Sequence, residues 1–262
     1  MTAPDRRTAL RTGTGLLAGA ALGSACSAQG GAVHPVAARP APSSSASSAS
    51  PHAAAPAPRR YPGMPAQITH GPRTRPRVAL TFHGQGDPAI ARALLTEAER
   101  HGARVTVLAV GTWLDQHPEM ARRVLDGGHD LGNHTQRHVD INALPEAEAR
   151  AEITGCADRL KKLTGSIGTW FRPSRAPRAS PLVTRLAAET GYPHVLSYDV
   201  DSLDFTAPGA AAVTRTVLGG VRNGSVVSLH FGYRDTVAAL PAVLDELDRR
   251  GLRAVTTTEL IG

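Results

Sequence analysis

The chain has 262 residues, a formal net charge of +7 and only 4% aromatic residues. Arginine carries almost all of the positive charge, but the arginines form no stripe with interleaved aromatics, so the composition argues against a nucleic-acid partner. Cysteine occurs only at Cys26 and Cys156. If Cys26 is removed or acylated, the folded part keeps one thiol and must be stabilised by its core without a disulfide.

The first 28 residues are predicted to be an export signal. Residues 5–11 resemble a twin-arginine motif, and the segment of small apolar residues from Gly15 to Ala25 is too short to span a bilayer permanently. The residues before Cys26 are similar to a lipoprotein cleavage box, although the leucine stands one position too early. A lipid anchor on Cys26 and an ordinary cleavage near Ala25 or Ala28 are equal alternatives. In both cases we expect an extracellular or envelope-associated protein.

Residues 29–72 are predicted to form a disordered tether. They are rich in Ala, Pro and Ser and supply few of the large apolar side chains that a core needs. The folded domain is therefore expected to cover residues 73–262. Export together with the positive charge favours anionic polymers of the cell envelope as electrostatic partners.

From about Arg77 onward, short β-rich runs alternate with amphipathic helical stretches, as in a parallel α/β sheet or barrel. Helix ends are marked by Pro118 with Gly127, and by Ser180-Pro181 with Gly191. Seven such units predict a distorted (β/α) barrel of about seven strands, with a doubly wound open sheet as the alternative. The expected strands begin near Val78, Arg104, His129, Thr169, Val195, Val226 and Arg253.

Polar residues of unusual type follow several of these predicted strands. Loops after the carboxyl ends of barrel strands converge on one face, so side chains that are distant in sequence can build one site there. The candidates are His83, His134, His138, Arg172, Asp204 and His230.

Two of these histidines, His134 and His138, are four residues apart. In a helical turn this spacing places two imidazoles on one face, where they can share a first-row metal ion, with zinc as the default candidate. Such a pair alone is more often a surface accident than a ligand pair. The sequence Gly-His-Asp-Leu-Gly-Asn at residues 128–133, directly before the pair, favours the ligand interpretation.

Several ordered motifs resemble those of the NodB-homology polysaccharide deacetylases, carbohydrate esterase family 4. The resemblance runs from about Arg77 to the C-terminus. It rests on residues 128–138, preceded by residues 77–82 and followed by residues 171–173, 199–205 and 228–230. The family has a distorted (β/α) barrel and uses a divalent metal to remove acetyl groups from N-acetylglucosamine polymers, or in some members O-acetyl groups.

The resemblance implies a role for each matching residue. His134 and His138 would be metal ligands, and Arg172 would orient the catalytic base. Asp204 would tune His230, the general acid expected to protonate the leaving amine, since a histidine near neutrality can donate a proton. Phe205 stands where the family usually has tryptophan and would form part of the groove wall. Phe205 and Pro173 are the expected substrate-binding residues.

The first motif departs from the family pattern. Where the family has Thr-Phe-Asp-Asp-Gly-Pro, residues 81–88 read Thr-Phe-His-Gly-Gln-Gly-Asp-Pro, so His83 replaces the catalytic base and Gly84 replaces a metal ligand. Glycine cannot coordinate a metal, and two histidines fall short of the three protein ligands common in catalytic zinc sites. The preferred interpretation makes His83 the third ligand and leaves no dedicated carboxylate base. Asp87 is a second candidate, and a solvated His83 beside a lost metal site is the third interpretation.

We therefore expect an exported, metal-dependent hydrolase of non-peptide carbon–nitrogen bonds. Its expected partner is an acetylated amino-sugar polymer of the N-acetylglucosamine type in the cell envelope. The alternative is a catalytically impaired glycan-binding module of the same fold, and a metal-independent hydrolase ranks third. Only His83 and Gly84 discriminate among these in the sequence.

Overall fold

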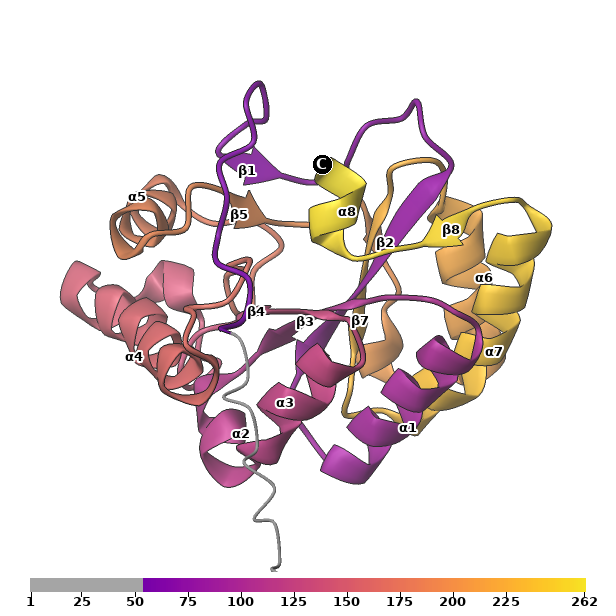
Figure 1. The fold of residues 1–262 in the computed structure, drawn as a ribbon, viewed down its shortest axis with the longest axis horizontal. Helices are drawn as coiled ribbons and strands as arrows, with labels where there is room; N and C mark the ends of the chain where they lie inside the picture. The colour runs from indigo at the N-terminus through magenta and orange to yellow at the C-terminus, as the bar shows by residue number, and fades with distance from the viewer. Residues whose placement is uncertain (1–53) are drawn as a thin grey trace, which may run out of the picture. The chain divides into compact units, whose positions relative to one another are not determined.

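The computed structural model describes residues 54–262, in which parallel strands are surrounded by helices (Figure 1). The expected signal, Cys26 and residues 29–53 lie outside the described residues. The strands are β1 (Gln67–Ile68), β2 (Arg77–Gly84), β3 (Thr106–Ala109), β4 (Asp130–Asn133), β5 (Val195–Leu196), β6 (Val200–Asp201), β7 (Val226–His230) and β8 (Arg253–Ala254). The helices are α1 (Pro88–Arg100), α2 (Gly111–Gln116), α3 (Glu119–Asp126), α4 (Glu146–Thr164), α5 (Pro181–Thr190), α6 (Ala210–Gly220), α7 (Arg234–Arg249) and α8 (Thr257–Ile261), with 3₁₀ turns η1 (Ile141–Ala143) and η2 (Asp204–Thr206).

The strands form a distorted, nearly closed barrel. The main sheet has the order β4-β3-β2-β7-β6, and β8 pairs with the beginning of β2. Phe171 bridges Asn133 at the end of β4 to Val195 in β5, and the chain runs from β5 directly into β6, which pairs with β7. This path nearly closes the ring and confirms the predicted distorted barrel. The strand expected near Thr169 is reduced to the single bridge at Phe171.

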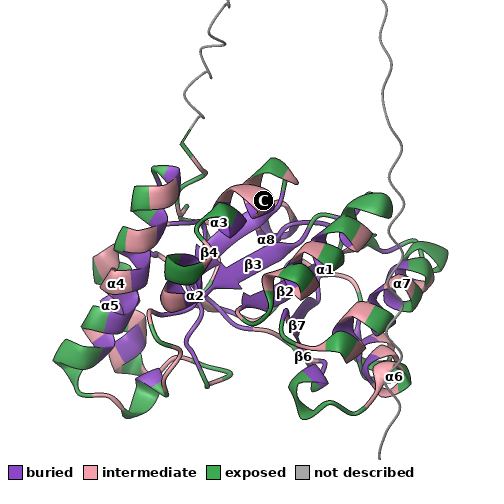
Figure 2. Cartoon of the chain, turned by 90° about the horizontal axis from the view of Figure 1, so that it is seen from below, coloured by how far each residue is buried: buried purple, intermediate pink, exposed green. Residues whose placement is uncertain are grey.

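The helices bury one face each against the strands. In α1, Ala91, Leu94, Leu95 and Ala98 recur every three or four residues and are all buried, which is the period of one helix face. Figure 2 shows β2, β3 and β4 buried, with exposed residues on the outward sides of the surrounding helices. The packed strands therefore form a rigid frame for the loops at their ends.

Helix ends follow the signals predicted from the sequence. Ser180 caps α5 by accepting a hydrogen bond from the Val183 N–H, and Pro181 is the first helical residue. Gly191 ends the same helix with a φ of 115°, a left-handed conformation that favours glycine. Gly127 follows the last residue of α3.

The segment from residue 54 to residue 72 packs on the domain, contrary to its expected place in a disordered tether. β1 pairs with β5, and Ile68 is fully buried. The ring of Tyr61 stacks on Trp170, with centroids 5.5 Å apart and planes 5° apart. The Tyr61 N–H also donates to Nε2 of His194 at 2.9 Å. The packed part of the chain thus begins earlier than the predicted boundary at residue 73.

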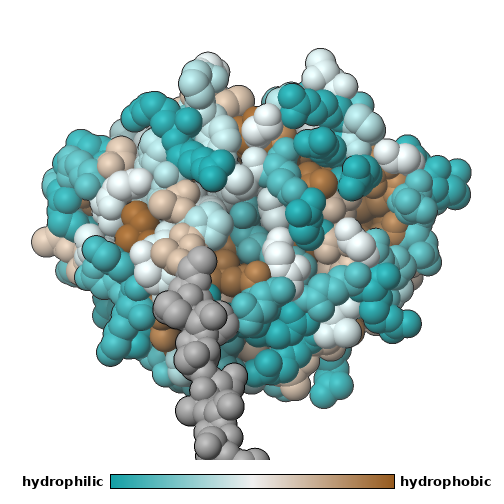
Figure 3. Space-filling view, viewed as in Figure 1, coloured by the Kyte–Doolittle hydropathy of each residue, from teal (hydrophilic) through white to brown (hydrophobic). Residues whose placement is uncertain are grey.

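Other features of the described residues agree with the composition. None of their helices is long and apolar enough to cross a membrane. The face in Figure 3 is mainly hydrophilic, with hydrophobic residues exposed in small patches. Cys156 is buried in α4, where burial raises the pKa of its thiol to about 12 and its S–H donates to the carbonyl of Ala109. Cys156 is therefore a packing residue.

Candidate active site

The carboxyl ends of β2 and β7 bring two candidate histidines together. Parallel pairing places His83 directly beside His230, and their ring centroids are 4.3 Å apart at an interplanar angle of 82°. Both side chains reach the same cavity. Strand register, which the sequence alone does not give, creates this contact.

The other two histidines lie in the loop after β4. The side chain of Asn133 shapes this loop: its Oδ1 accepts from the Thr135 N–H at 2.8 Å, and its Nδ2 donates to the carbonyl of Ile153 at 2.9 Å. Thr135 and His138 have positive φ values of 70° and 58°. These values are incompatible with a helix, so the predicted helical turn at residues 134–138 is wrong. The loop nevertheless holds the rings of His134 and His138 with centroids 4.9 Å apart.

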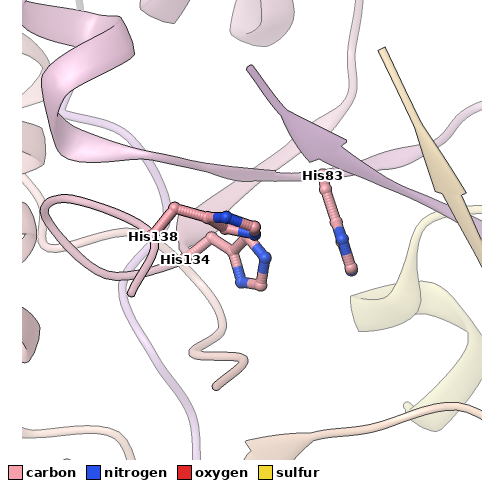
Figure 4. A group of neighbouring side chains, drawn as sticks. All are labelled: His83, His134 and His138. Atoms are coloured by element: carbon pink, nitrogen blue, oxygen red, sulfur yellow. The ribbon is translucent and has the colours of Figure 1, made fainter. Parts of the chain in front are cut away.

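His83, His134 and His138 form one cluster (Figure 4), in which one ring nitrogen of each lies within 4.8 Å of the others. Two buried nitrogens, Nδ1 of His83 and Nε2 of His134, have no hydrogen-bond partner among the described residues. Unpartnered buried polar atoms are costly unless a ligand satisfies them. Three imidazoles with two free nitrogens therefore suit a divalent metal that prefers nitrogen ligands.

All three imidazoles are held in the neutral form. Burial and the neighbouring rings keep the pKa of His83 and of His134 well below the usual value. Burial, followed by the positive charge of Arg175, lowers the pKa of His138 to about 4. Neutral imidazole is the form that ligates metals, so the cluster needs no deprotonation at neutral pH.

Arg172 lies behind this cluster and is fully buried. Its guanidinium donates to the carbonyls of Leu196 and Ser197 at 3.2 and 3.0 Å, and to Nε2 of His83 at 3.2 Å. His83, at the position of the family's catalytic base, thus has the expected arginine partner. Its side chain is an imidazole and not a carboxylate. Because Arg172 occupies Nε2, the free nitrogen of His83 is Nδ1.

His230 is held by a carboxylate on its far side. Oδ1 of Asp204 accepts from Nδ1 of His230 at 2.6 Å, and Oδ2 accepts from the His230 main-chain N–H at 2.8 Å and from the Thr236 hydroxyl at 2.7 Å. Asp204 is fully buried. This arrangement fixes the proton on Nδ1 and leaves Nε2 available to a reacting group.

The imidazoles open into a cavity of about 650 Å³. Pro173 and Phe205 line it, as predicted for substrate-binding residues, and Phe205 remains 45% exposed with its ring 5.5 Å from that of His230. Sequence reasoning missed other lining residues because cavity membership depends on tertiary packing. Among them are three that follow strand ends or bridges: Arg175, Tyr198 and Tyr233.

Two other expectations are decided by local geometry. Asp87 caps α1 by accepting from the Ala89 N–H at 2.8 Å and is not part of the histidine cluster, so the suggestion that it completes the metal site is wrong. Gly84 remains in β2, where an added Cβ would lie 3.0 Å from the Cα of Ala109 and from the side chain of Val107. The side-chain direction at residue 84 is therefore toward the neighbouring strand β3.

Comparisons with known proteins agree with this geometry. The profile of the polysaccharide deacetylase family matches residues 70–195. A peptidoglycan N-acetylglucosamine deacetylase of Bacillus cereus is 30% identical over 194 residues, which cover 72% of this chain and 90% of that protein. The deacetylase PgdA of Listeria monocytogenes is 28% identical over 206 residues, or 78% of this chain, but the match spans only 43% of that longer relative.

Solved structures show the same fold. A peptidoglycan N-acetylglucosamine deacetylase crystallised with a hydroxamate has a TM-score of 0.70 at 26% identity, covering 75% of this chain and 92% of that one. A family 4 pseudoenzyme from Bacillus anthracis has a TM-score of 0.71 at 22% identity, and the match covers 76% of this chain and 70% of that one. The chain therefore belongs to the polysaccharide deacetylase family, the NodB-homology proteins of carbohydrate esterase family 4.

Proposed function

We propose that this protein is an exported, metal-dependent hydrolase that removes N-acetyl groups from an N-acetylglucosamine-type polysaccharide of the cell envelope. The observation that carries the proposal is the cluster of His83, His134 and His138, in which two buried ring nitrogens have no partner among the described residues. His83 and His138 line the same cavity as His230, which the Asp204 carboxylate holds. The similar deacetylases named above support the acetylated amino sugar as substrate.

The three imidazoles would hold the metal, and zinc suits them best because catalytic zinc sites commonly have three protein ligands and one open position. When bound, such an ion supplies Lewis-acid polarisation of the acetyl carbonyl and of water. Ligation by Nδ1 of His83 would place the proton on Nε2, opposite the N–H of Arg172. Metal binding through this nitrogen therefore requires the Arg172 guanidinium to move away.

The remaining residues position the sugar and move a proton. The imidazolium form of His230, stabilised by the Asp204 carboxylate, would donate its Nε2 proton to the leaving amine and become a neutral imidazole. The exposed ring of Phe205 and the ring of Tyr233 offer apolar faces to the sugar. The geometry thus provides an acid and a binding surface.

A dedicated base is the missing part. His83 stands where the family has a carboxylate, and its depressed pKa makes it a weak proton acceptor. General-base catalysis is worth about 10²–10⁴-fold, so turnover is expected to be slow compared with a family member that keeps the carboxylate.

This absence favours the second candidate function, a glycan-binding module without turnover. The structural similarity to a pseudoenzyme of the family, which was also crystallised as a mutant with restored activity, is consistent with it. An exported location is part of the proposal in either case, with a lipid anchor through Cys26 and an ordinary cleavage near Ala25 or Ala28 as its two alternatives.

Acetate release from peptidoglycan and from chitooligosaccharides, measured with the metal content of the purified protein, tests the proposal. One equivalent of metal and acetate release that is lost in His134→Ala would support the enzyme. Stoichiometric metal or glycan binding without acetate above the His134→Ala background would favour the binding module.

A further inference from the structure

Arg175 places an unpaired positive charge on the wall of the cavity. Its side chain lines the cavity near His138 and Pro173, and within residues 54–262 it has no ion-pair or side-chain hydrogen-bond partner. Because the Arg175 side chain is exposed, water solvates its guanidinium, which stays free to pair with an anion that enters the cavity. The feature therefore offers a binding point for a negatively charged group from outside the domain.

The loop that carries Arg175 is held firmly on both sides. The buried Ser174 hydroxyl donates to the carbonyl of Val139 at 2.5 Å and accepts from the Thr135 hydroxyl at 3.0 Å. On the other side, the Ser197 hydroxyl donates to the carbonyl of Pro177. These contacts fix the main chain around Arg175, whose φ is 54°, and so limit where the guanidinium can reach.

Within residues 54–262, Arg175 forms no ion pair with the charged groups around the cavity. Asp201 is the one carboxylate among the described residues that line the cavity, and its Oδ1 accepts from the Leu203 N–H at 3.1 Å. The nearby Asp204 carboxylate is already engaged by His230 and Thr236. The Arg172 guanidinium is buried behind the lining, so Arg175 is the one arginine among the described residues that line the cavity.

Arg175 and His138 line the same cavity. The guanidinium is therefore within electrostatic reach of the place where substrate would be bound, although its own side chain is exposed at the mouth of the cavity.

We infer that Arg175 binds a carboxylate of the substrate, so that the site selects an anionic amino-sugar polymer over a neutral chitooligosaccharide. The inference rests on the proposed function for the identity of the acetylated sugar. The exposed position of Arg175 assigns the carboxylate to a sugar next to the acetylated one. The planar guanidinium can form two parallel hydrogen bonds with a carboxylate, which an uncharged hydroxyl cannot offer.

Two probes that differ only in charge test this selection. One is an oligosaccharide in which N-acetylglucosamine alternates with a lactyl-carboxylate-bearing N-acetylmuramic acid, and the other is the same oligosaccharide with its carboxylates amidated. For the metal-loaded full chain, Arg175→Gln should raise KM about tenfold for the carboxylated probe, the loss expected for one charge-assisted contact. KM for the amidated probe and kcat for both should stay unchanged, and Arg175→Lys should recover part of the loss.

Arg178 provides the matched control. It is an exposed arginine three residues later that does not line the cavity. Arg178→Gln removes the same charge and should leave both KM values unchanged. An equal rise for Arg175→Gln and Arg178→Gln would overturn the inference by showing a general charge effect. A fall in kcat on both probes for Arg175→Gln would also overturn it, because the guanidinium would then act on the reacting acetyl group.

Calorimetric binding separates this inference from the proposed function. In one outcome neither probe releases acetate, but the carboxylated probe binds about tenfold more tightly than the amidated one, and this difference disappears in Arg175→Gln. The selection then stands and the deacetylase proposal fails. If both release acetate and bind equally well, the selection fails and the deacetylase stands. The comparison of the two probes on the unmodified protein decides the question even if an Arg175 variant does not fold.

Discussion

Replacing His83 with alanine tests whether the altered first motif is an adapted metal site. His83 is 8% exposed, its Nδ1 has no partner, and its Nε2 accepts from Arg172. The substitution relieves one buried unpartnered nitrogen but leaves the Arg172 N–H without its acceptor. Each of these effects is worth about 1–3 kcal/mol, so they offset one another and the metal-free protein should unfold at nearly the same denaturant concentration.

The metal-dependent part of the stability should behave differently. A ligand at 1,000 times its dissociation constant stabilises the native state by about 4 kcal/mol. If His83 is the third ligand, His83→Ala leaves two imidazoles, and most of this increment should disappear together with stoichiometric binding. The assay is urea unfolding with and without zinc, with elemental analysis of the purified protein and the unmodified chain as reference.

A full equivalent of zinc in His83→Ala, with an unchanged zinc-dependent shift of the unfolding midpoint, would refute the reasoning. The metal would then be held by His134 and His138 with solvent, and His83 would be free to serve as a weak base. Loss of the zinc increment in His134→Ala but not in His83→Ala would lead to the same conclusion.

Three other predictions concern the rest of the site. Gly84→Asp should destabilise the domain and fail to restore a metal ligand, because the new side chain would meet Ala109 of β3. A stable Gly84→Asp variant that binds zinc more tightly would contradict this prediction. The metal-free protein should lose stability as the pH falls from 6.5 toward 4. The pKa of His138 is about 4 in the folded state and near 6.5 in the unfolded state, so the unfolded chain binds more protons in that pH range. Equal urea midpoints at pH 7 and pH 5 would count against this prediction. Asp204→Asn should keep zinc but slow acetate release about a hundredfold or more by weakening the hold on the His230 tautomer, and an unchanged rate would exclude His230 as the acid.

The sequence predicted those features that depend on local chemistry. The alternation of strands and helices, the caps of α3 and α5, and the candidate residues after strand ends are short-range patterns. The loop of residues 134–138 could not be predicted in this way, because its course depends on Asn133 contacting α4 and Tyr192, which is distant in sequence. A spacing of four residues fits both a helix and this loop.

The early start of the packed domain was hidden for a similar reason. Residues 54–72 contain few apolar side chains, and Tyr61 and Ile68 are informative only once their partners Trp170 and β5 are known. Arg175 likewise carries no sequence signal for a cavity, since an exposed arginine is ordinary on any surface. Tertiary neighbours decide what these residues do.

The contacts of residues 54–56 show at which end of the barrel the described chain begins. The Ala55 N–H donates to the carbonyl of Thr164 at the end of α4, and the Pro56 carbonyl accepts from Ser166, which lies just beyond that helix. A helix that follows one barrel strand ends near the start of the next, so this attachment is at the amino ends of the strands, whereas the cavity is at their carboxyl ends. The chain therefore enters the packed domain at the end of the barrel opposite the cavity, where a polymer would bind.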